Sequence, residues 1–110
     1  FHAMLEAMFH VTPPTALIVD EAEFFVAVMQ FCIKRRLRVP EDISLICTDD
    51  HPVFAWCRPT VAHIAWDHRP VVRRVLQWVS SVDRGHPDLR QTFTTARFAS
   101  GGTVGAPPGG

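Results

Sequence analysis

Hydrophobic side chains recur along the start of the chain first with the spacing of an α-helix and then with that of a strand. Apolar residues three or four apart predict an amphipathic helix over residues 1–10, with a buried side made of Phe1, Met4, Leu5, Met8 and Phe9. Pro13 and Pro14 end this helix, because proline lacks a backbone N–H and clashes with the preceding turn. The run TALIV (15–19) is almost wholly apolar and predicts a strand buried on both faces.

A second helix and a second strand follow at once. Apolar residues at helical spacing after Asp20 or Glu21 predict an amphipathic helix whose apolar side holds Phe24, Phe25, Val28, Met29, Cys32 and Ile33. The run ISLIC (43–47) predicts another buried strand. Helices and strands that alternate with short connections indicate a parallel α/β sheet.

The second half of the chain continues this alternation. The segment TVAHIAW (60–66) predicts a third strand, and Asp67 is a candidate N-cap for a helix with Pro70 in its first turn. The buried stripe of that helix would consist of Val71, Val72, Val75, Leu76, Val79 and Val82. Residues 90–98 alternate like a final strand, and the glycine-rich residues 99–110 predict a flexible tail.

The composition of the chain argues against several classes of function. The 110 residues carry eleven basic and eleven acidic side chains, so this segment has no general electrostatic attraction for nucleic acid or an anionic membrane. No apolar run approaches the roughly 20 residues of a membrane span, and we expect a soluble, cytoplasmic protein. Cys32, Cys47 and Cys57 form no CxxC pair. The spacing of His51, Cys57 and His63 fits no zinc pattern. Without a GxSxG, HExxH or phosphate-loop motif, we expect neither catalysis nor a cofactor or metal.

Pairs of acidic residues follow the first two predicted strands. Asp20 and Glu21 come after the first, and Asp49 and Asp50 after the second. Ligands of parallel sheets bind beyond the carboxyl ends of the strands, which makes both pairs candidates for a binding site. Each pair also has a structural interpretation. Asp49 could be a solvated carboxylate at a strand end, and Asp20 or Glu21 could cap the following helix and pair with its dipole.

Four segments together resemble the lactose/galactose repressor family of bacterial transcription regulators. They are PTAL (14–17), LRVPEDISLI (37–46), the adjacent Asp49 and Asp50, and RPTVAHI (58–64). The resemblance implies an α/β, parallel-sheet effector domain of the periplasmic-binding-protein-like type I fold, of which this chain would be the C-terminal portion only. Residues 1–98 would form that part of the effector-binding and dimerisation domain, and residues 99–110 the tail.

The resemblance also implies roles for the acidic residues. Asp49 would accept hydrogen bonds from hydroxyls of a sugar-like effector, and Asp50 would hold the following turn. At the other expected contact the family carries Asn-Asp, whereas this chain has Glu21 and Ala22. Either Asp20 or Glu21 supplies that contact from a shifted position, or the effector is unusual, or the site no longer binds sugar.

A homodimer interface is the third expectation. Phe54, Trp56 and Cys57 lie in a short turn between prolines, and aromatic residues are enriched at interface cores. The alternative is that Phe54 and Trp56 fold back onto their own lobe. In the related repressors the matching loop and the helix after the first strand belong to the dimer contact, which adds Phe24, Phe25, Val28 and Phe31.

Taken together, the sequence and the resemblance predict the effector-sensing and dimerisation segment of a DNA-binding regulator. Operator DNA would be bound through a missing N-terminal domain, since no helix-turn-helix is found in this chain and it begins at Phe1 rather than Met. One alternative is a solute-binding protein for a sugar with the same fold. Another is a degenerate domain retained for dimerisation.

Overall fold

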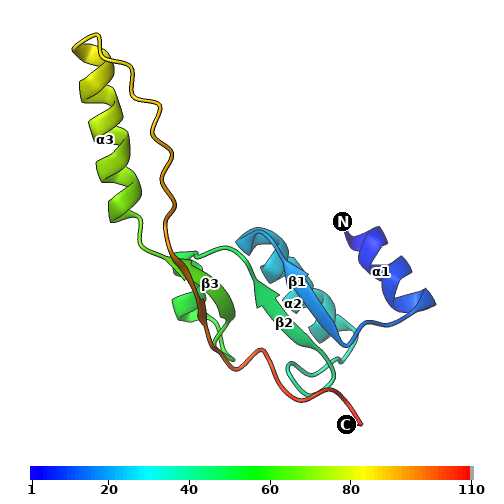
Figure 1. The fold of residues 1–110 in the computed structure, drawn as a ribbon. Helices are drawn as coiled ribbons and strands as arrows, with labels where there is room; N and C mark the ends of the chain where they lie inside the picture. Colours follow the sequence, from blue (N-terminus) through cyan, green and yellow to red (C-terminus); the bar gives the residue numbers. More distant parts are fainter. Residues whose placement is uncertain (110) are drawn as a thin grey trace. The chain divides into compact units, whose positions relative to one another are not determined.

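The computed structural model describes residues 1–109 and shows the predicted alternation of helices and strands (Figure 1). Its elements are α1 (His2–Val11), β1 (Ala16–Val19), α2 (Ala22–Lys34), β2 (Ser44–Cys47), the short 3₁₀ helix η1 (Pro52–Trp56), β3 (Ala62–Trp66), α3 (Arg69–Asp83) and β4 (Ala96–Ala99). The prediction missed η1. It also made the last strand too long, since only the end of the alternating segment forms a strand.

The strands form one sheet in the order β1-β2-β3-β4. β1 and β2 are parallel and pair over their whole length, from Ala16 opposite Ser44 to Val19 opposite Cys47. β3 is also parallel to β2, and its pairing begins at Ile46 opposite Ala62. The predicted fold class, a parallel-sheet α/β domain, is therefore confirmed.

The chain divides into two compact units, one made of residues 1–65 with 98–110 and the other of residues 66–97. The first unit holds the hydrophobic core, in which side chains of α1 and α2 pack with those of β1 and β2. Phe25, Leu45 and Ile43 are fully buried at its centre. The expectation that β1 is buried on both faces was wrong, because Ile18 is 73% exposed. The core covers one face of the strand, and nothing in residues 1–109 buries Ile18 on the other.

α2 buries the side that had been expected to meet a second copy. Phe25, Val28 and Phe31 are buried in the core, and Phe54 of η1 packs edge-on against Phe25, with ring centroids 5.6 Å apart. These four residues were predicted as interface contacts, but their own domain already covers them. Phe54 thus follows the alternative interpretation, whereas Trp56 does not.

The second unit is a helix whose apolar stripe is uncovered. The six residues predicted to be buried along α3 are all exposed, by between 37% for Val71 and 62% for Leu76. The stripe has the predicted helical spacing, but no other element of the described residues packs on it. The unit is held instead by polar contacts between α3 and the segment that follows it.

Part of the predicted tail, residues 101–105, packs against the first unit. Thr103 is fully buried, and its side chain hydrogen-bonds to the main chain of β2 and β3. In Figure 1 this segment, drawn in red, runs back along the first unit. Composition alone predicted a flexible tail because glycine-rich sequences are usually linkers, whereas here the glycines allow close contact with the sheet. We call residues 101–105 the C-terminal strap.

The contrast between two adjacent phenylalanines tests this assignment of the faces of α2. Phe25→Ala should lower the free energy of unfolding by about 3–5 kcal/mol, since it empties a fully buried site. Phe24→Ala should cost only about 1 kcal/mol, because Phe24 is 39% exposed and its main contact is a stacked pair with Phe1. Urea denaturation of both variants measures the difference, and equal losses would contradict the assignment.

Candidate functional site

The acidic pairs meet at one edge of the sheet. Because β1 and β2 are parallel and in register, Asp20 and Glu21 at the end of one strand lie beside Asp49 and Asp50 at the end of the other. Thr48, between the two strand ends, fixes this arrangement. Its backbone N–H donates to Val19 O at 2.8 Å, and its hydroxyl donates to Asp20 O at 3.3 Å.

Asp49 has a definite structural role at this edge. Its Oδ2 accepts a hydrogen bond of 3.3 Å from the backbone N–H of Ala22, the first residue of α2. A carboxylate there satisfies one of the unpaired N–H groups at a helix start and interacts favourably with the helix dipole. The carboxylate is half-buried, so it is neither a freely solvated strand end nor removed from solvent.

Asp20 and Glu21 do not cap the helix as expected. Glu21 occupies the N-cap position of α2, but its side chain makes no capping hydrogen bond, and both side chains are exposed. The capping acceptor comes from Asp49, which is 27 residues away in sequence. No local sequence signal indicates such a cap, because N-cap rules consider only the residues next to the helix.

Asp50 lies toward β3 rather than toward α2. Its Oδ1 is 3.5 Å from Nε2 of His63, whose Nδ1 is 2.8 Å from Val61 O. The imidazole also contacts the ring of Phe54, with centroids 5.4 Å apart. Asp50 and His63 therefore connect the turn after β2 to the start of β3.

A shallow, mainly apolar pocket of about 320 Å³ adjoins the first turn of α2. It is lined by Ala22, Glu23, Val26, His51 and Val53. The imidazole of His51 accepts a hydrogen bond of 3.1 Å from the N–H of Val53 and so caps η1. Sequence reasoning missed Val26 and Val53, because neither belongs to the apolar stripe that faces the core.

The remaining predicted interface residues are unequally accessible. Trp56 is 86% exposed and Phe24 39% exposed. Cys57 is half-buried, and its thiol donates to Val53 O at 3.5 Å. Burial raises the pKa of the other two cysteines, Cys32 and Cys47.

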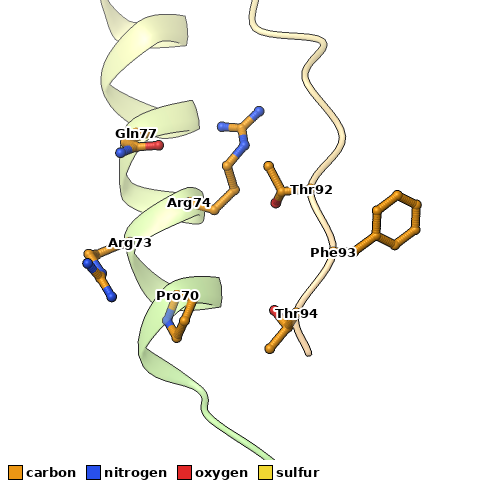
Figure 2. A pocket seen from close by; sticks show the side chains of 7 residues that line it. All are labelled: Pro70, Arg73, Arg74, Gln77, Thr92, Phe93 and Thr94. Atoms are coloured by element: carbon orange, nitrogen blue, oxygen red, sulfur yellow. The ribbon is translucent and has the colours of Figure 1, made fainter. Parts of the chain in front are cut away.

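A second pocket, of about 300 Å³, lies wholly within residues 66–97 (Figure 2). Arg74, Thr92 and Thr94 line the space between α3 and the segment 92–94, whereas Arg73 and Phe93 point away from it. The guanidinium of Arg74 donates two hydrogen bonds, of 2.8 and 3.0 Å, to the carboxylate of Asp88. A cation already paired in this way adds little attraction for an anionic ligand, so this pocket is a weaker candidate.

The described residues offer no other obvious chemistry. Within residues 1–109 there is no group of three or more His, Cys, Asp or Glu side chains that could hold a metal ion. In the same range no helix is long and apolar enough to cross a membrane. The strand-end carboxylates with the adjoining pocket are thus the leading candidate site.

Comparison with known proteins identifies the family. Residues 2–103 match the family model of the periplasmic binding protein-like domain, and the chain belongs to this family. No curated protein matches the sequence. Its fold is that of part of the effector domain of LacI-type regulators, which confirms the resemblance drawn from the sequence.

Three solved structures illustrate the likeness. A LacI family transcriptional regulator from Bifidobacterium animalis subsp. lactis has a TM-score of 0.80 and 21% identity, covering 96% of this chain and 39% of its own. The dimeric Lac repressor with an 11-residue C-terminal deletion has a TM-score of 0.82 and 20% identity, with coverages of 97% and 39%. A PurR family transcriptional regulator from Vibrio parahaemolyticus has a TM-score of 0.77 and 14% identity, covering 96% of this chain and 38% of its own. This chain thus spans about two fifths of the structures it resembles, and these are regulators rather than enzymes.

The contacts of Asp88 with Arg90 and Arg74 make the second unit sensitive to strong acid. The guanidinium groups of Arg90 and Arg74 lower the pKa of Asp88 to about 2, against about 3.9 for an unfolded Asp. Since the folded-state pKa is the lower one, the stabilisation from these contacts is complete above pH ~4 and is lost as the pH falls through 2. NMR titration of the Asp88 carboxyl carbon should give a midpoint near pH 2, and Arg90→Gln should move it upward. A wild-type midpoint near 4 would contradict the pairing.

Proposed function

We propose that this chain is the effector-sensing and dimerisation segment of a bacterial DNA-binding transcription regulator with a sugar-like effector. The observation that carries the proposal is the position of Asp49, a half-buried carboxylate at the carboxyl ends of two parallel strands in a domain of this family. Ligands of parallel sheets bind at this edge. The regulators of similar fold support the transcriptional role.

A carboxylate suits a sugar because it accepts charge-assisted hydrogen bonds from hydroxyl groups. The bond from Ala22 uses Oδ2 of Asp49, and a carboxylate has about four acceptor positions, so the cap and an effector are compatible. Ala22 itself is buried and has no polar side-chain atom. A second contact would therefore come from Asp20 or Glu21, both of which are exposed.

Two alternatives share the same fold. A solute-binding protein for a sugar would use the same strand-end carboxylates, and the name of the family, periplasmic binding protein-like, fits such a role. A degenerate domain retained for dimerisation is favoured by Ala22, which stands where the resembling family carries an Asp. A titration with sugars separates these two alternatives, because the solute-binding protein binds a sugar and the degenerate domain does not.

Operator binding would rely on a segment outside this chain, since a formal net charge of zero gives this chain no general attraction for DNA. The regulator would bind two half-sites as a homodimer. We infer an interface built from side chains that this domain leaves accessible near η1, namely Trp56 and Val26, beside the half-buried Val53. In a two-fold dimer this patch would meet its own copy. The Lac repressor of similar fold is described as dimeric.

The first test concerns the effector. In the regulator that contains this chain, Asp49→Ala should weaken binding of a sugar effector, once one is found by a thermal-shift screen, by about 1.5–3 kcal/mol. Asp49→Asn is the matched control, since its amide oxygen can still accept from Ala22 while its charge is gone. Calorimetry should rank affinity as wild type, then Asn, then Ala. Equal affinities of all three proteins would remove Asp49 from the site.

The second test concerns the dimer. Trp56→Ala combined with Val26→Ala should shift the regulator toward monomer in analytical ultracentrifugation, because both changes remove exposed apolar contact area. Operator affinity should fall together with the loss of the dimer. Trp78→Ala, a half-exposed tryptophan of α3, is the control and should leave the dimer intact. A double mutant that sediments as the wild-type dimer across the micromolar range would place the interface elsewhere.

A further inference from the structure

The C-terminal strap lies against the first unit with almost no space between the two main chains. A Cβ atom added to Gly101 would lie 2.5 Å from Thr60 O and 2.6 Å from Ala62 N, too close for any side chain. At Gly105 it would lie 3.1 Å from the ring of Pro40, a tight contact. The glycines are thus explained by close packing of the backbone rather than by flexibility.

Thr103 is the centre of this contact. It is fully buried, and its hydroxyl donates to Leu45 O at 2.7 Å while accepting from Ala62 N–H at 2.9 Å. Its own carbonyl accepts from Leu45 N–H at 2.8 Å. One side chain therefore joins the main chain of β2 to the first residue of β3.

The strap occupies a place that β3 leaves open. β3 begins to pair with β2 only at Ile46, so residues 44 and 45 lie ahead of that pairing. Thr103 meets Leu45, and Gly105 exchanges two hydrogen bonds with the Ser44 hydroxyl, at 3.0 and 3.3 Å. The strap therefore runs antiparallel to β2 and satisfies polar groups at its start.

Both connections between the two units begin close to this contact. One leaves the first unit through β3, whose first residue, Ala62, donates to Thr103. The other returns through β4, which ends at Ala99, two residues before the strap. We propose that the strap is the common anchor of both connections, with Thr103 as the positioning residue that holds them to β2.

The proposal has a mechanical consequence for the domain. The strap adds to the pairing of β3 with β2 and of β4 with β3, so relative motion of the two units should be confined to the few residues between these contacts and residues 66–97. The base of β2, whose far end carries Asp49, then stays in place during such motion. Loss of the Thr103 hydroxyl should loosen both connections together while leaving the α2 core unchanged.

The test compares Thr103→Val with Thr103→Ser in the 110-residue chain. Valine keeps the volume of threonine but removes the hydroxyl, whereas serine retains it and should rescue the wild-type behaviour. In Thr103→Val the amide of Ala62 loses its hydrogen bond to the Thr103 hydroxyl, and the amide of Leu45 is bonded to the carbonyl of the same residue. Hydrogen exchange at both amides should therefore accelerate at least about tenfold. Exchange at Phe25 and Val28 in α2 should change less than about twofold.

A second readout reports on the connections themselves. With spin labels at Gln30 and Ser80, one in each unit, the inter-unit distance distribution should broaden in Thr103→Val and stay at wild-type width in Thr103→Ser. If the valine variant does not fold, Ser44→Ala takes its place. This substitution removes an exposed hydrogen bond between Ser44 and Gly105 at the far end of the strap, and it should broaden the distance distribution less than Thr103→Val. Uniformly faster exchange across α2, or an unchanged distance distribution in a folded Thr103→Val or Ser44→Ala variant, would overturn the proposal.

Discussion

The in-register parallel pairing of β1 with β2 is the constraint on which the other features of the first unit depend. It brings the two strand ends, and with them four carboxylates, to one edge of the sheet. It also places Leu45 and Cys47 on the face covered by the core, where both are fully buried. A shift of one residue would turn every side chain of a strand to the opposite face. The Thr48 bonds to Val19 and Asp20 hold the register at the site end.

The order of helices and strands could be predicted from sequence because it depends on local patterns. Apolar residues at spacings of three and four marked α1, α2 and α3, and short apolar runs marked β1 and β2. The acidic residues were correctly placed at strand ends for the same reason. The end of each element was predicted less well, as β4 shows, since alternation alone does not make a segment pair with a neighbour.

Features that depend on contacts between distant residues could not be predicted. Asp49 caps a helix 27 residues earlier, and Thr103 bonds to residues 41 and 58 positions away. Phe25, Val28 and Phe31 were predicted as dimer contacts from the family resemblance, and the structure places them on the side of α2 that faces the core. Val26, on the other side, has no pattern that distinguishes it from any surface valine.

The two units are stabilised by different physics. The first buries phenylalanine, leucine and isoleucine side chains in a common core, which is the main source of stability for a small domain. The second has a helix of 15 residues with none of them buried, and such helices draw most of their stability from tertiary packing that is missing here. The contacts that hold it are mainly polar and include the Arg74–Asp88 pair, the bond from Arg74 to Arg90 O and the contacts of Arg90 with Asp88 and Gln77. Because these contacts are polar and local, they stabilise the second unit less than the apolar core stabilises the first.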